Sequence, residues 1–125
     1  MSTPVALRIL QIEDSVEDAE LTSIELIDAG LPVECRRVEN EASLLEALAT
    51  FKPQLILSDL GLPGFSGTRA LQLVREQVPT ARFIILSGTD QCDHPGVPGI
   101  DGWLCKRDAA RLPALIREWF DVPVA

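Results

Sequence analysis

Four short apolar runs, each followed at once by a charged or hydroxyl side chain, constrain this sequence more than any other feature. The runs cover residues 7–12, 55–57, 83–86 and 103–105. Short, mostly apolar runs are typical of strands buried on both faces of a parallel sheet. Because stretches with helical spacing separate most of them, we expect strand and helix to alternate, with right-handed crossovers and helices on both faces of the sheet.

Turn and cap residues set the bounds of the expected elements. Gly30 supplies a stop for the first helix, Asn40 can cap the second, and Pro113 is tolerable in the first turn of the last. The expected strands are 7–12, 33–38, 55–58, 82–87 and 103–105, and the expected helices are 18–29, 41–51, 67–77 and 112–120. The strand at 33–38 alternates apolar and polar residues, as a strand near the sheet edge does.

One connection departs from this alternation. Between Ser87 and Trp103 the chain has two prolines, several glycines and almost no apolar periodicity. We therefore expect an irregular loop with at most one helical turn, so that a helix between the fourth and fifth strands is short or missing.

Length and composition favour one small domain. The 125 residues are 46% hydrophobic, and no linker divides them, so a single domain over 1–125 is expected. No apolar stretch approaches the ~20 residues of a membrane span, and the N-terminus lacks the basic region and cleavage site of a signal peptide. We expect a cytoplasmic protein without membrane insertion, whose three cysteines are reduced thiols.

Charge disfavours direct nucleic-acid binding. Nineteen acidic and eleven basic residues give a formal net charge of −8. The adjacent basic pair Arg36-Arg37 falls in an expected strand. A nucleic-acid-binding domain needs a basic surface to neutralise phosphates, and this composition does not supply one.

The polar residues that follow the apolar runs predict a site. In an open parallel sheet, ligands bind beyond the carboxyl ends of the strands. Glu13 and Asp14 can address one ligand there only if the first strand ends near residue 12, since neighbours in a strand point to opposite faces. Magnesium prefers oxygen donors. We expect Mg²⁺ (or Mn²⁺) bound directly by Asp14 and Asp59, by the Gly61 carbonyl, and by Glu13 through a water.

The same residues can receive a phosphoryl group. An aspartate can act as a nucleophile toward phosphorus, and Asp59 is the expected acceptor. The transferred group needs positive charge or hydrogen-bond donors at its equatorial oxygens. The metal ion, the Lys106 ammonium and the Ser87 hydroxyl would supply them.

Together these residues make the chain resemble the receiver domain of two-component response regulators over essentially its whole length. The resemblance is carried by Glu13-Asp14, the segment 59–67 (DLGLPGFSG), Leu86-Ser87-Gly88 and the segment 102–106 (GWLCK). It implies a flavodoxin-like three-layer α/β sandwich with five parallel strands in the order 2-1-3-4-5.

The resemblance also implies a function. Receiver domains take a phosphoryl group from a histidine of a sensor kinase or phosphotransfer protein and hydrolyse it slowly, which here places it on Asp59. They assist their own phosphorylation and dephosphorylation but are not multiple-turnover enzymes. Phosphorylation draws in a hydroxyl and an aromatic ring, at positions matched here by Ser87 and Trp103, and changes contacts with an output domain or a downstream protein.

Two residues depart from the family pattern. Arg107 stands where a proline usually follows the lysine, and Trp103 stands where tyrosine or phenylalanine is commoner. Dimerisation through the fourth helix, fifth strand and fifth helix is less expected because the segment before Trp103 is short. An alternative is therefore a pseudo-receiver, a protein-binding module that is not phosphorylated. A phosphatase with an aspartyl nucleophile is a weaker alternative. Such enzymes generally carry a second acidic residue two positions after the nucleophile, and in this chain Gly61 occupies that position after Asp59.

Overall fold

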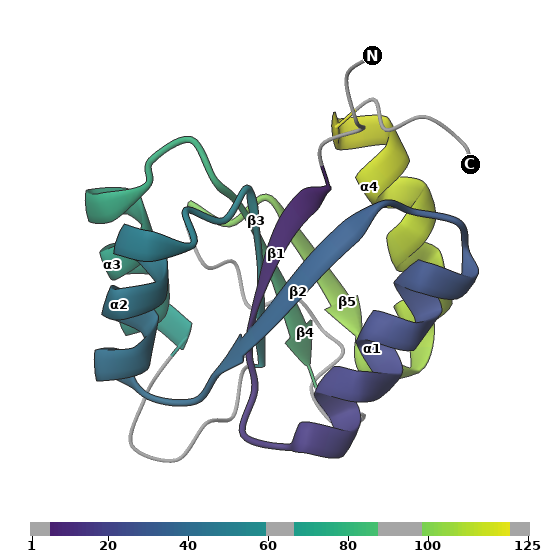
Figure 1. Ribbon diagram of the computed structural model, residues 1–125, viewed down its shortest axis with the longest axis horizontal. Coiled ribbons are helices and arrows are strands. Elements are labelled where there is room, and N and C mark those ends of the chain that lie inside the picture. Colours follow the sequence, from purple (N-terminus) through teal and green to yellow (C-terminus); the bar gives the residue numbers. More distant parts are fainter. Residues whose placement is uncertain (1–5, 60–66, 88–98, 121–125) are drawn as a thin grey trace.

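The computed structural model describes residues 6–59, 67–87 and 99–120, and these form a parallel sheet between two layers of helices (Figure 1). The sheet has five strands in the order β2-β1-β3-β4-β5, and every neighbouring pair is parallel. The strands are β1 (Leu7–Ile12), β2 (Val33–Val38), β3 (Leu55–Asp59), β4 (Arg82–Ser87) and β5 (Gly102–Cys105). The predicted fold class, strand order and edge position of residues 33–38 are confirmed.

Within the described residues, four α-helices cover the sheet: α1 (Val16–Asp28), α2 (Glu41–Thr50), α3 (Gly67–Gln77) and α4 (Leu112–Phe120). Figure 1 shows α2 and α3 on one face and α1 and α4 on the other. The predicted bounds of the last two helices are confirmed. The irregular loop expected before Trp103 falls mostly on residues 88–98, outside the described residues. The described part, residues 99–101, contains no helix.

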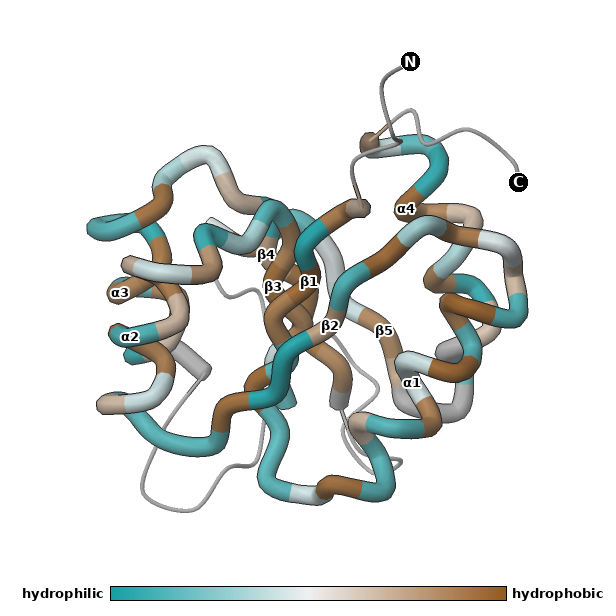
Figure 2. The backbone as a smooth tube through the Cα atoms, viewed as in Figure 1, coloured by the Kyte–Doolittle hydropathy of each residue, from teal (hydrophilic) through white to brown (hydrophobic). Residues whose placement is uncertain are grey.

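Two apolar clusters hold the layers together, one on each face of the sheet. Alternate residues of β1 divide between them: Leu10 and Ile12 pack with α2 and α3, whereas Leu7 and Ile9 pack with α1 and α4. The central strands are hydrophobic along most of their length, and β2 is mixed (Figure 2). This is the pattern expected of strands covered on both faces, flanked by a half-covered edge strand.

Helix α1 differs from its expected form. It begins at Val16, because the Ser15 side chain caps it by accepting a hydrogen bond from the Asp18 backbone N–H. Leu21, Ile24 and Ile27 have the helical spacing of a buried stripe, but they are 66, 51 and 59% exposed. At 100° per residue, these three side chains point away from the face that carries the buried Ala19 and Leu26.

A polar contact under α1 replaces part of that stripe. The Gln11 side chain on β1 is buried, and its amide donates hydrogen bonds to the Ser23 hydroxyl at 2.9 Å and to the Ala19 carbonyl at 3.2 Å. Burial of an amide is tolerated only when its hydrogen bonds are made, so this pair fixes how α1 lies on the sheet.

Between β5 and α4 the chain forms a 3₁₀ helix, η1 (Lys106–Arg111), for which the sequence analysis made no prediction. Cys35 is a free thiol, whereas Cys105 is disulfide-bonded, so the expectation of reduced thiols is wrong for Cys105. None of the helices in the described part of the chain is long and apolar enough to cross a membrane.

Candidate phosphoacceptor and metal site

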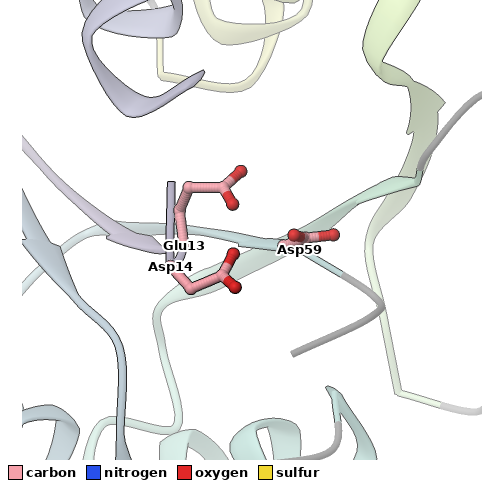
Figure 3. Close-up of side chains that lie close together, drawn as sticks. All are labelled: Glu13, Asp14 and Asp59. Atoms are coloured by element: carbon pink, nitrogen blue, oxygen red, sulfur yellow. The ribbon is translucent and has the colours of Figure 1, made fainter. Parts of the chain in front are cut away.

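Three carboxylates meet where β1 and β3 end. Oxygens of Glu13, Asp14 and Asp59 all lie within 4.8 Å of one another. Figure 3 shows the three side chains directed toward one region, Glu13 and Asp14 from the residues after β1 and Asp59 from the end of β3. β1 ends at Ile12 and the backbone bends at Asp14, so the two acidic neighbours are not both held in extended strand, as the sequence analysis required.

Hydrogen bonds hold the Glu13 segment in place. Its backbone N–H donates to the Val38 carbonyl at 3.0 Å, and the Arg37 guanidinium donates to its carbonyl at 3.1 Å. Its carboxylate accepts from the Ser15 backbone N–H at 3.3 Å. Glu13 is only 6% exposed, while Asp14 is exposed and Asp59 is half-buried.

The three acids fit a small divalent cation. Two oxygens bound to one octahedral Mg²⁺ lie about 3 to 4 Å apart, since each Mg–O bond is about 2.0–2.1 Å. The oxygens of the three carboxylates lie within 4.8 Å of one another, a spacing close to this range. All of its donors are hard oxygens, the type that Mg²⁺ and Mn²⁺ prefer.

Asp59, Ser87 and Lys106 lie at the same edge on three neighbouring strands. The β3–β4 register pairs Asp59 with Leu86, so Ser87 lies one residue further along β4. The β4–β5 register pairs Ser87 with Cys105, and Lys106 follows directly as the first residue of η1. The backbone therefore brings these positions together, while the Ser87 and Lys106 side chains and the whole of Gly61 lie outside what the structure describes.

Trp103, the predicted switch aromatic, lies in β5 opposite Ile85. It is half-buried and packs against the apolar cluster beneath α2 and α3. Partial burial was expected for a ring of this size. Its role as a switch stays a prediction.

The sequence analysis missed two residues that position the site. Ser15 was not identified as a cap, although Ser15-Val16-Glu17-Asp18 has the spacing of a capping box, a hydroxyl followed three residues later by an acid. Arg37 was seen only as part of a basic pair. No local pattern indicates that a β2 side chain reaches the carbonyl of Glu13, because the two are 24 residues apart.

Comparisons with known proteins agree with the fold. The family model for the response regulator receiver domain matches residues 9–116. The signal receiver domain of a LuxO repressor protein from Vibrio parahaemolyticus superposes with a TM-score of 0.75 at 27% identity, covering 91% of this chain and 89% of that one. The response regulator domain of Thermotoga maritima CheB gives 0.74 at 19% identity, covering 95% and 99%.

Curated relatives match over a shorter segment. The DNA-binding transcriptional regulator NtrC of Escherichia coli K12 is 35% identical over 65 residues, which is 52% of this chain and 14% of that protein. The NtrC of Proteus hauseri is 34% identical over 59 residues, 47% of this chain and 12% of that protein. The chain thus matches only a small part of each of these relatives. The family model, in contrast, matches nearly the whole of this chain. The chain belongs to the response regulator receiver domain family.

Proposed function

We propose that this chain is a phosphoacceptor module in which Asp59 takes a phosphoryl group from a histidine of a sensor kinase or phosphotransfer protein, with Mg²⁺ bound beside it. The observation that carries the proposal is the meeting of Glu13, Asp14 and Asp59 within 4.8 Å at the carboxyl edge of the sheet. Family membership supports it, because phosphoryl acceptance is the general activity of receiver domains.

The transfer requires one bond to form and one to break. A carboxylate oxygen of Asp59 attacks phosphorus, the bond between phosphorus and the histidine nitrogen breaks, and the electron pair stays on the imidazole. Bound Mg²⁺ would supply positive charge to the phosphoryl oxygens as the group moves. Asp14 and the Gly61 carbonyl would hold the ion together with Asp59, and Glu13 would do so through a water.

Two further groups complete the proposed site. The Lys106 ammonium and the Ser87 hydroxyl would contact the phosphoryl oxygens, and the strand registers support this by bringing both backbone positions to the same edge as Asp59. Water would later hydrolyse the acyl phosphate. Each cycle takes one phosphoryl group from a donor protein, which leaves unphosphorylated, and releases that group slowly as inorganic phosphate. The module would therefore act as a signalling acceptor and not as a multiple-turnover enzyme.

The response to phosphorylation would be a change of contacts. Ser87 would move toward the phosphoryl group, and Trp103 would turn in behind it from its half-buried position on the α2–α3 side. The readout would be an output domain or a downstream protein. NtrC relatives are described as DNA-binding regulators, but the net charge of −8 on this chain makes it a poor nucleic-acid binder by itself.

Phosphoryl uptake from a small acyl phosphate tests the proposal. We expect wild-type protein to gain the mass of one phosphoryl group when Mg²⁺ is present and none when the metal is chelated, as measured by intact-mass spectrometry. Asp59→Asn should gain nothing, whereas Asp28→Asn, on the exposed end of α1, should label like wild type. Wild type that never labels would favour the pseudo-receiver, and equal labelling of Asp59→Asn would remove Asp59 from its role.

A further inference from the structure

The edge strand β2 has one open side. Only β1 pairs with it in the described part of the chain. The Pro32 and Val38 carbonyls accept hydrogen bonds from Leu7 and Glu13, on the β1 side. Because successive residues of a strand direct their backbone groups to alternate sides, the N–H and C=O groups of Val33, Cys35 and Arg37 point outward. In Figure 1, β2 crosses in front of β1, with α1 on one side of it and α2 on the other.

Two exposed side chains of opposite charge flank the centre of this edge. Glu34 and Arg36 are two residues apart, so they lie on the same face of β2. Neither forms an ion pair with any other described residue. The Arg36 guanidinium stacks over the Phe51 ring at 4.6 Å from its centroid, which holds this charge against the edge. Charged residues usually protect an open edge from pairing, but a plus–minus pair can also select one partner.

The charges select one register for pairing with a second copy. A two-fold antiparallel pair centred on Cys35 puts Glu34 directly opposite Arg36 of the second copy, and Arg36 opposite its Glu34. Centring the pair on Glu34 or on Arg36 would instead put two like charges opposite each other. Opposite charges in facing positions stabilise a strand pair and like charges destabilise it. The register centred on Cys35 also aligns the outward N–H and C=O groups of Val33 and Arg37 with each other.

The surface beside this edge is apolar and uncovered. A groove of about 430 Å³ runs between α1 and β2, and its lining includes Val16, Ile24 and Cys35. Val16 and Ile24 are each 51% exposed. A two-fold axis perpendicular to the sheet would bring α1 of the second copy to the same face, next to this groove. Apolar groups of both copies would then leave water together.

We propose that the open edge of β2 is a homodimer interface, in which the β2 strands of two copies pair antiparallel about Cys35 and continue the sheet across both molecules. The occupant is a second copy because the charge pattern is self-complementary. This interface involves β2 and α1 and makes no use of β5 or the last helix. It is independent of phosphoryl transfer, since no acceptor or metal-binding residue takes part in the pairing.

Charge reversal tests the register. We expect sedimentation velocity at increasing concentration, up to millimolar, to show wild type forming a species of twice the monomer mass. Glu34→Arg and Arg36→Glu should each raise the dimer dissociation constant by about tenfold or more, because each creates two like-charge pairs per dimer. The double variant Glu34→Arg/Arg36→Glu should restore the wild-type constant. Glu118→Arg, the same charge change on α4, should have no effect.

Cross-linking at Cys35 provides a second readout that needs no charge variant. Facing residues of a hydrogen-bonded antiparallel pair have Cα atoms about 5.5 Å apart, within reach of a disulfide or a short bismaleimide. Mass spectrometry should therefore find the Cys35 peptide joined to itself, and Cys35→Ser should abolish that product. A chain that remains monomeric at every concentration would overturn the proposal. A dimer insensitive to both single reversals, or cross-linked elsewhere, would overturn it too.

Discussion

At the scale of single residues, the proximity of the Glu13, Asp14 and Asp59 carboxylates has an energetic cost. Three negative charges within 4.8 Å repel one another, and nothing in hydrophobic packing calls for them at one place. Such an arrangement is retained when a cation or a reaction needs it. The metal-free protein should therefore be less stable than a variant that lacks one of the three charges.

Replacing Asp14 by asparagine separates this repulsion from metal binding. We expect Asp14→Asn to stabilise the metal-free protein by about 1 kcal/mol, the size of one like-charge interaction at this distance near water. The same change should shrink the stabilisation that Mg²⁺ provides, because a ligand is lost. Thermal unfolding with and without Mg²⁺ measures both effects, with Asp28→Asn as control. An Asp14→Asn protein that is less stable without metal, yet responds normally to Mg²⁺, would contradict the assignment.

The fold changes the ionisation of the Cys35 thiol. Burial raises the pKa of its thiol, and hydrogen bonds with Ser23 and Gln11 oppose the shift only partly. The folded state thus favours the neutral thiol. Its contribution to stability is complete below the pKa of an unfolded-chain cysteine and is lost as the pH rises through the higher pKa of the folded state.

Alkylation kinetics measure this shift. The rate at which iodoacetamide modifies Cys35 follows the thiolate fraction, so the midpoint of its pH profile should be higher in the native protein than in urea. Peptide mass spectrometry distinguishes Cys35 from the other cysteines. A native midpoint equal to or below the unfolded one would show that burial does not control this thiol.

At the scale of elements, the contact between β5 and α4 is the tightest that the structure shows at a glycine. A Cβ atom on Gly102 would lie 3.0 Å from Cη2 of Trp119 and 3.4 Å from Cγ1 of Ile84. Trp119 also lies under the Arg82 guanidinium, 5.5 Å from its ring centroid. The Trp119 ring therefore contacts both the Arg82 guanidinium and Gly102 of β5, and these contacts limit how closely α4 can approach β5.

Adding one methyl group at this position should move the helix. We expect Gly102→Ala to destabilise the protein by about 1–3 kcal/mol in urea unfolding, the usual cost of overpacking. In a Trp119→Leu background the same substitution should cost clearly less, since the clashing atom is gone. Equal costs in the two backgrounds would mean that the contact with Trp119 does not set the spacing.

The helices and strands were largely predictable, because the spacing of apolar residues and the positions of prolines and glycines indicate the same bounds along most of the chain. β1, β2, α3, β4 and α4 have the bounds that apolar runs, prolines and glycines indicated. For helix α1 the prediction was wrong about the first residue of the helix and about which of its residues are buried. Its apolar residues were counted without regard to angle, and the polar Ser23, which lies on the sheet side, was not expected to contact a buried glutamine. Side-chain pairs between distant segments leave no local pattern, which is also why the role of Arg37 was missed.

At the scale of the whole molecule, the site follows from topology. A parallel sheet brings the carboxyl ends of all its strands to one edge, so residues 13, 14, 59, 87 and 106 converge once the strands are identified. This is why their convergence could be predicted from sequence without any measured distance. The order β2-β1-β3-β4-β5 came from family resemblance, because alternation of strand and helix alone allows several orders. That same order leaves β2 at the edge, where a second copy can pair.

The central claim is that Asp59 receives the phosphoryl group, and its chemical position can be read directly. Borohydride reduces an aspartyl phosphate to homoserine, so treating the acyl-phosphate-labelled protein with borohydride marks the acceptor permanently. Peptide mass spectrometry should find homoserine at position 59, only when Mg²⁺ was present during labelling, and aspartate or glutamate unchanged at positions 13 and 14. Homoserine at another position with aspartate intact at 59 would contradict the account.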